Sequence, residues 1–297
     1  MLRASSRLSR HSLHFALALG LALIAAPAAP AHAAATAAVT LPPDEAGALA
    51  RLEASPRHAE WVDLALGEGE AKLRTYVVYP ERSDKAPVVI VIQEVYGLTP
   101  WLRSVADRLA AEGFIAIAPD YLSGRGPGGG GTDSTTSKDE AVKLTRSLTP
   151  ADVLLRTRAA HVYGLALPAA NGRLGAIGFC WGGGRSFEYA AATPPPDAAV
   201  VYYGGSPDSA TLLAVTAPVL GMYGADDARV NATIPAAEAA LAARRKFYEP
   251  NLYPGAGHGF LRQLDGRDGA NLAAAQQAWP RTLAFLREKL EVAATKP

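Results

Sequence analysis

The residues with the clearest capacity for chemistry surround Cys180, the only cysteine in the chain. Cys180 lies in Gly178-Phe179-Cys180-Trp181-Gly182, between a strand-like apolar stretch and a helix-like one. A nucleophile between two glycines at this spacing sits on a tight, strained turn, where side chains two residues away would collide with neighbouring backbone. The turn also places the sulfur near a helix N-terminus, whose partial positive charge favours the thiolate. The motif therefore predicts a nucleophilic cysteine rather than a buried structural one.

The candidate base is His258, which is the one histidine that follows Cys180. It lies between Gly257 and Gly259, just after a predicted strand, and these glycines suit a loop in which the imidazole approaches other backbone closely. His58 and His161 precede the cysteine, and we assign them structural or solvent-facing roles. An imidazole at this position can take the proton of a nucleophile and later return it to a leaving group.

The candidate acid lies between the nucleophile and the base, in the chain order that this type of site follows. A predicted strand ends at Tyr223, and Asp226 and Asp227 come directly after it. Either carboxylate could orient the imidazole and stabilise its protonated form. The residue types alone leave both alternatives open.

A third group of candidates follows the buried strand Ala86–Ile92, in Gln93-Glu94-Val95-Tyr96-Gly97. A loop at this position supplies one backbone donor of an oxyanion hole, and the residue after the nucleophile supplies the other, which makes the Val95 and Trp181 amides the candidates. Glu94 at the end of a buried strand needs a proton or a partner, because an isolated buried carboxylate is costly. The thiol is the partner we expect; the alternative is that Glu94 reaches solvent.

These residues require a scaffold, and the sequence predicts one in which strands alternate with helices. The predicted strands are 60–66, 72–79, 86–92, 114–118, 173–179, 198–203, 218–223 and 246–253. The predicted helices are 99–112, 137–148, 151–163, 183–192, 234–243 and 272–290, the last with a kink or break at Pro280. Such alternation predicts an α/β fold with a mainly parallel sheet covered on both faces. In such sheets the chemistry gathers at the carboxyl ends of the strands.

The N-terminal region differs from the rest of the 297-residue chain. Residues 1–33 have a basic start, a short apolar run and a small-x-small ending, which is typical of a secretory signal peptide. We therefore expect export to a periplasm or the medium, with no stable membrane association after cleavage. Residues 34–58 are interpreted as a linker or N-terminal extension, and residues 59–297 as the catalytic domain.

Composition excludes several other classes of protein. Lysine plus arginine nearly balances aspartate plus glutamate, and the formal net charge of +1 gives no reason to expect a nucleic-acid partner. A single cysteine excludes an intrachain disulfide. We find no cluster of residues with metal-ligand spacing, and the glycine-rich stretch 124–131 lacks the ending of a phosphate-binding loop.

Four motifs together resemble the dienelactone hydrolase family, whose members have the α/β-hydrolase fold. They are Gln93-Glu94-x-x-Gly97, the glycine-flanked elbow at residues 178–184, Gly224-x-x-Asp227, and Gly257-His258-x-Phe260-x-Arg262. The resemblance covers about residues 60 to 290 and places the motifs in the family's order.

The resemblance implies a role for each matching residue. Cys180, Asp227 and His258 correspond to a catalytic triad, with Asp227 favoured over Asp226, and Glu94 to a residue that helps to activate the thiol. Arg262 corresponds to an arginine that holds the substrate carboxylate; a looser alignment places a second such arginine at Lys138, where lysine keeps the charge but loses the bidentate geometry. Tyr96 is expected to line the same site.

The resulting prediction is a monomeric hydrolase of a small ester or enol-lactone that needs no cofactor or metal. Its expected partner is the small-molecule substrate alone. A broad-specificity carboxylesterase or thioesterase is an alternative within the same fold. A non-catalytic exported binding protein with this fold is an alternative from another class.

Overall fold

The structure is a computed structural model that describes residues 39–69 and 71–291. The expected export signal at residues 1–33 lies outside the described residues, as do the first residues of the expected linker, and export stays a prediction.

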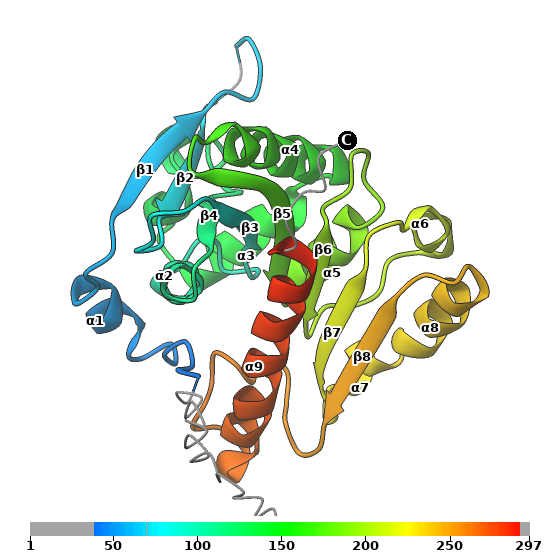
Figure 1. The fold of residues 1–297 in the computed structure, drawn as a ribbon. Helices are drawn as coiled ribbons and strands as arrows, with labels where there is room; N and C mark the ends of the chain where they lie inside the picture. Colours follow the sequence, from blue (N-terminus) through cyan, green and yellow to red (C-terminus); the bar gives the residue numbers. More distant parts are fainter. Residues whose placement is uncertain (1–38, 70, 292–297) are drawn as a thin grey trace, which may run out of the picture. The chain divides into compact units, whose positions relative to one another are not determined.

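An eight-stranded sheet forms the centre of the described domain, as Figure 1 shows. Its strands are β1 (Ala59–Leu64), β2 (Leu73–Val78), β3 (Ala86–Ile92), β4 (Ile115–Pro119), β5 (Ala170–Phe179), β6 (Ala198–Tyr202), β7 (Val219–Gly224) and β8 (Tyr248–Tyr253). The strand order is β1-β2-β4-β3-β5-β6-β7-β8. The β1–β2 and β2–β4 pairs are antiparallel, and every later pair is parallel. The six strands from β4 to β8 therefore point their carboxyl ends to one edge.

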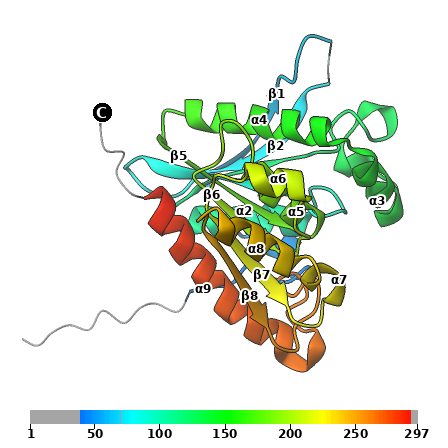
Figure 2. The same ribbon diagram turned by 90° about the vertical axis from the view of Figure 1, so that its right-hand side faces the viewer.

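Helices cover both faces of this sheet (Figures 1 and 2). They are α1 (Ala48–Glu53), α2 (Pro100–Ala111), α3 (Lys138–Ser147), α4 (Pro150–Ala166), α5 (Trp181–Tyr189), α6 (Ser209–Ala214), α7 (Ala228–Asn231), α8 (Ile234–Ala243) and α9 (Ala270–Leu290). Short 3₁₀ turns occur at Pro127–Gly129, Thr132–Ser134 and Arg267–Gly269. Helices α2 and α9 lie on one face, while α4, α5 and α8 lie on the other. This arrangement confirms the predicted mainly parallel α/β sheet.

Strand β3 shows why the apolar runs of the sequence become central strands. All seven of its residues are buried. Because side chains alternate across a strand, Val89 and Val91 join the core beneath α2 and α9, whereas Val88 and Ile90 join the core beneath α4. A continuous apolar run therefore fits a strand that is buried on both faces.

The last helix continues through Pro280. Helix α9 runs from Ala270 to Leu290 as one helix, so the break, which was one of the two expected consequences of Pro280, does not occur. Proline removes one backbone hydrogen bond and disfavours a helix interior. Here Trp279 and Leu283 are buried beside it, and burial of these apolar side chains offsets the unfavourable proline.

The described part of residues 34–58, which were interpreted as a linker or N-terminal extension, packs against the domain. Residues 39–58 belong to the same compact unit as the rest of the domain and contain helix α1. Trp101 Nε1 donates a hydrogen bond to Pro43 O (3.0 Å), and Arg57 forms a buried ion pair with Asp107 (2.5 Å). These contacts lie far apart in the sequence, so local composition could not indicate them.

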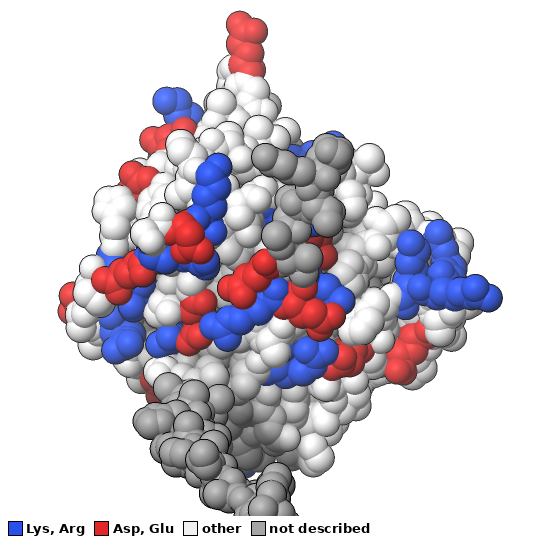
Figure 3. All heavy atoms as spheres, viewed as in Figure 1, with Lys and Arg blue, Asp and Glu red and all other residues white. Residues whose placement is uncertain are grey.

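The distribution of charged side chains on the surface is consistent with the near-equal numbers of basic and acidic residues. On the face seen in Figure 3, acidic and basic side chains are interspersed over the central part. Within residues 39–69 and 71–291, none of the helices combines the length and the apolar character that a membrane span requires.

Candidate active site

The candidate residues lie at the carboxyl ends of five neighbouring parallel strands. Glu94 follows β3, Cys180 follows β5, Tyr203 follows β6, Asp227 follows β7, and His258 follows β8. These strands are adjacent in the order β3-β5-β6-β7-β8, so their ends meet along one edge of the sheet. Side chains from far-separated segments can therefore converge at this edge.

Cys180 occupies a strained turn between β5 and α5. Its backbone has φ 56° and ψ −115°, an unfavourable conformation for a residue with a side chain. The flanking glycines explain how the turn closes, because a Cβ at Gly178 would lie 1.9 Å from Gly182 O. A Cβ at Gly182 would lie 2.3 Å from Gln93 O, which belongs to the loop after β3. A side chain at either glycine would therefore collide with backbone atoms, as the glycine spacing predicted.

Two backbone amides point at the sulfur of Cys180. They belong to Trp181 and Val95, the two residues expected to form the oxyanion hole, and their hydrogen bonds act to lower the thiol pKa. Burial and the nearby Glu94 carboxylate outweigh them and raise the pKa of Cys180 to about 11. The resting thiol is therefore protonated at neutral pH. The amide at the helix N-terminus favours the thiolate, as expected from the sequence, but burial and Glu94 have the larger effect.

His258 pairs with one of the two competing carboxylates. The distance from His258 Nδ1 to Asp227 Oδ2 is 2.5 Å, and the Asp227 side chain is 8% exposed. Asp226 instead pairs with Arg267 at 3.0 Å on the surface. With Nδ1 donating to Asp227, Nε2 of a neutral imidazole is free to accept a proton. The structure thus places Asp227, rather than Asp226, beside the candidate base.

Tyr203 lies beside the candidate base and was not selected from the sequence. Its ring centroid is 5.2 Å from that of His258. Its hydroxyl is buried and has no hydrogen-bond partner among the described residues. Burial, Glu94 and Cys180 all raise its pKa, which places the phenol in the same electrostatic environment as the thiol. In the described residues no hydrogen bond joins Cys180 to His258 directly. Its position directly after β6 is the one sequence signal that could have identified it.

Glu94 has a cationic partner that the sequence analysis did not assign to it. The side chain is almost fully buried, and Arg262 Nε lies 2.9 Å from Glu94 Oε2. Burial raises the pKa of Glu94 to about 7, although Arg262 opposes this rise. Glu94 does not reach solvent. Its charge also acts on Cys180, so the expected proximity of carboxylate and thiol is present.

The three residues assigned to substrate binding lie together. The Arg262 guanidinium lies 5.3 Å from the ring centroid of Tyr96, and the Lys138 ammonium lies 5.5 Å from it. Both cations also contact Glu45, from the segment that was interpreted as a linker. No local pattern distinguishes Glu45 from other acidic residues, so the sequence could not reveal this contact.

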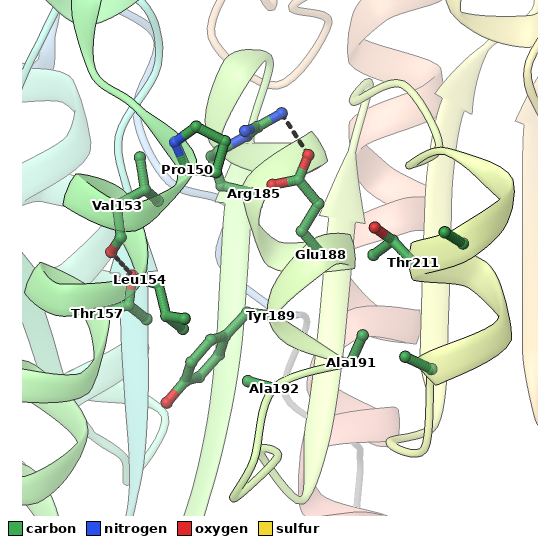
Figure 4. A pocket seen from close by; sticks show the side chains of 12 residues that line it. Pro150, Val153, Leu154, Thr157, Arg185, Glu188, Tyr189, Ala191, Ala192 and Thr211 are labelled. Carbon is green, nitrogen blue, oxygen red and sulfur yellow. Dashed lines mark hydrogen bonds and ion pairs between the residues drawn. The ribbon is translucent and has the colours of Figure 1, made fainter.

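A separate pocket of about 380 Å³ lies among α4, α5 and α6 and shares no residue with this site. Figure 4 shows the Arg185–Glu188 ion pair at one end and Tyr189 at the other, with small apolar side chains between them. It holds no nucleophile beside a base. Within the described part of the chain, no group of three His, Cys, Asp or Glu side chains is placed to hold a metal ion.

Comparison with known proteins gives consistent matches. A family model described as "Dienelactone hydrolase family" matches residues 73–290. A proposed carboxymethylenebutenolidase of Salmonella typhimurium is 36% identical over 230 residues, which cover 72% of this chain and 82% of the relative. A similarly named protein of Escherichia coli K12 is 32% identical over 230 residues, covering 72% and 81%.

Solved structures agree with these matches. The crystal structure of a proposed dienelactone hydrolase from Klebsiella pneumoniae has a TM-score of 0.67 and 31% identity, and the match covers 78% of this chain and 99% of that one. A dienelactone hydrolase-like promiscuous phosphotriesterase from metagenomic libraries has a TM-score of 0.66 and 25% identity, covering 79% and 99%. These similarities confirm the predicted α/β-hydrolase fold.

Proposed function

Because this chain belongs to the dienelactone hydrolase family, we propose that it hydrolyses a small carboxylic ester or enol-lactone with Cys180 as the nucleophile. One observation carries the proposal: the Val95 and Trp181 amides converge on the Cys180 sulfur, at the sheet edge where His258 pairs with Asp227. Nucleophile, oxyanion donors, base and acid are the groups that acyl transfer requires.

The proposed reaction proceeds through a thioester. The Cys180 thiolate attacks the carbonyl carbon, and the carbonyl oxygen takes the place of the sulfur between the Val95 and Trp181 amides. Glu94 holds the proton that the thiol has lost, and His258, which carries a proton on both ring nitrogens when the ester binds, gives its Nε2 proton to the leaving oxygen as the carbon–oxygen bond breaks. His258 then removes a proton from water, the hydroxide attacks the thioester, and the carbon–sulfur bond breaks as the released sulfur regains its proton from Glu94. Asp227 keeps the imidazole in the required tautomer and stabilises its positive charge.

The test of the proposed function is hydrolysis by the purified protein, measured side by side on dienelactone and p-nitrophenyl acetate. We expect turnover of the neutral ester, which reports on the acyl-transfer groups alone. Dienelactone turnover at a comparable or higher rate supports a lactone-specific enzyme. A much lower dienelactone rate supports the broad carboxylesterase, which the contact of Glu45 with Arg262 and Lys138 favours. Hydrolysis of neither compound would contradict the proposal.

Glu94 is proposed to accept the thiol proton, and its buried charge predicts a characteristic effect on stability. The folded-state pKa of about 7 lies above the usual glutamate value of 4.5, so the folded protein binds more protons than the unfolded chain between these pH values. The contribution of protonated Glu94 to the free energy of unfolding is therefore fully present below about pH 4.5 and is lost as the pH rises through 7. At 1.36 kcal/mol per pKa unit, the loss amounts to roughly 3 kcal/mol.

We therefore expect Glu94→Gln to match the wild type in stability at about pH 4 and to exceed it by up to roughly 3 kcal/mol at about pH 8. The same variant should lose at least about tenfold in kcat/KM for p-nitrophenyl acetate, since a positioned base contributes at least this much. Urea unfolding at both pH values and steady-state kinetics measure the two effects. Glu53→Gln, which removes an exposed carboxylate, is the control. Equal pH dependence of stability in Glu94→Gln and the wild type would refute the assignment.

A further inference from the structure

The backbone of residues 39–47 holds the Glu45 side chain against the candidate site. The Glu45 backbone N–H donates to Arg262 O at 3.0 Å, and Pro43 O accepts the Trp101 indole N–H at 3.0 Å. Asp44 Oδ1 accepts from the Gly47 N–H at 2.8 Å and closes the turn that follows. Three separate hydrogen bonds thus fix the backbone around Glu45. The segment is therefore anchored to the domain where the Glu45 side chain contacts Arg262.

The Glu45 carboxylate lies between two cations that share an aromatic ring. Its Oε1 accepts from Lys138 Nζ at 2.8 Å, and its Oε2 accepts from the Arg262 guanidinium. Both cations lie over Tyr96. Burial acts to raise the pKa of Glu45, but Lys138 and Arg262 outweigh burial and lower it, so the group is ionised at neutral pH. The structure therefore contains a carboxylate-binding subsite with a carboxylate in place.

The charges in this subsite are already balanced. Arg262 faces Glu94 as well as Glu45, so Lys138 and Arg262 stand opposite two carboxylates. With Glu94 ionised, a substrate carboxylate would meet a neutral cluster while Glu45 remains, and a cluster with one unpaired positive charge once Glu45 leaves. Departure is feasible because the Glu45 side chain is 37% exposed, and ion pairs at such exposure are weak.

We propose that Glu45 is a specificity-determining residue that competes with the carboxylate of an acidic substrate for the subsite formed by Lys138, Arg262 and Tyr96. The proposal rests on the proposed function only in that this subsite adjoins the candidate nucleophile. The apparent affinity for an acidic ligand equals the intrinsic affinity multiplied by the fraction of molecules in which Glu45 is displaced from the subsite. The affinity for neutral esters does not depend on this fraction. The family match begins at residue 73, so the competing residue lies outside the matched region.

The test measures binding in the absence of turnover. In the full chain carrying Cys180→Ala, calorimetry would determine the Kd of succinate and of dimethyl succinate before and after Glu45→Gln. We expect succinate to bind about tenfold more tightly after the change, which corresponds to about 1.4 kcal/mol. Binding of dimethyl succinate should stay unchanged. Glu53→Gln removes one charge from the same N-terminal region without touching the subsite, and it should leave both values unchanged.

A kinetic measurement gives a second readout in the chain that retains Cys180. Glu45→Gln should raise the ratio of kcat/KM for the mono-p-nitrophenyl ester of succinic acid to kcat/KM for p-nitrophenyl acetate by about tenfold, because any effect of the change on Glu94 is common to both esters. Glu45→Ser, assayed alongside, replaces Glu45→Gln if thermal unfolding shows a folding defect. Equal succinate affinity with and without Glu45 would overturn the proposal, as would equal gains for succinate and its diester. Because binding is measured without hydrolysis, this failure is distinguishable from a failure of the proposed function.

Discussion

The Cys180→Ala protein is expected to hydrolyse p-nitrophenyl acetate at least about 10⁴-fold more slowly than the wild type, because removal of the nucleophile leaves only substrate binding and the oxyanion donors to accelerate the reaction. The thiol is small and lies at the sheet edge, so the fold should tolerate its loss. Steady-state kinetics on matched preparations, with thermal unfolding to confirm the fold, measure the effect.

The matched control for this experiment is Ser206→Ala. Ser206 follows two glycines near the same edge of the sheet but lacks the glycine that an elbow requires on its other side. Its side chain contacts Thr233 and none of the candidate catalytic residues. The rate of this variant should therefore stay within about twofold of the wild-type rate, because substitutions away from the reacting groups usually have small effects. Undiminished hydrolysis by Cys180→Ala, or a large loss in Ser206→Ala, would require another nucleophile.

Asp227→Asn should lower kcat by about 10²-fold or more, because an amide can donate to His258 Nδ1 and so favours the tautomer whose Nε2 cannot take a proton from water. The neighbouring Asp226→Asn variant offers a control of identical chemistry one residue away. Asp226 is 46% exposed and contacts only the exposed Arg267, so its loss should change kcat by less than about twofold. Rates on p-nitrophenyl acetate decide between the carboxylates. A larger loss in Asp226→Asn, or equal losses in both, would contradict the assignment of the acid.

The parts of the fold that could be predicted from sequence are those with local signals. Apolar runs such as Ala86–Ile92 became central strands with the predicted bounds, and the helix Ile234–Ala243 also has them. The elbow glycines were interpretable because their spacing reflects a steric requirement within five residues. The carboxyl-end rule then placed Glu94, Cys180, Asp227 and His258 on one edge of the sheet.

The parts that were missed depend on contacts between distant segments. The Glu45–Arg262 pair joins residues 217 positions apart, and neither residue type is unusual in its local sequence. Glu94 was expected to have the thiol as its partner, yet the nearest charge belongs to Arg262, which lies on a loop after the last strand. Burial of these groups is a property of the assembled fold, so their pKa values could not be inferred from spacing.

The thiol itself shows how two local rules can compete. A helix N-terminus favours a thiolate, and the Trp181 amide does act in this direction. Burial and the charge of Glu94 act in the opposite direction and are larger. The sequence indicated both the helix N-terminus and the neighbouring Glu94, and the structure shows that burial and the charge of Glu94 have the larger effect on the thiol pKa. A buried, protonated thiol beside a carboxyl group of pKa about 7 implies that proton transfer precedes attack on the substrate.

The central claim is that Cys180 forms a covalent bond to the acyl group, and acid-quench mass spectrometry tests it most directly. The wild-type protein is mixed with p-nitrophenyl acetate, quenched in acid within the first turnovers, digested and mapped. We predict an acetyl group on the peptide that contains Cys180, removable by hydroxylamine as a thioester is. Release of p-nitrophenolate with an unmodified Cys180 peptide, or an acetyl group on another side chain formed at the rate of turnover, would contradict the account.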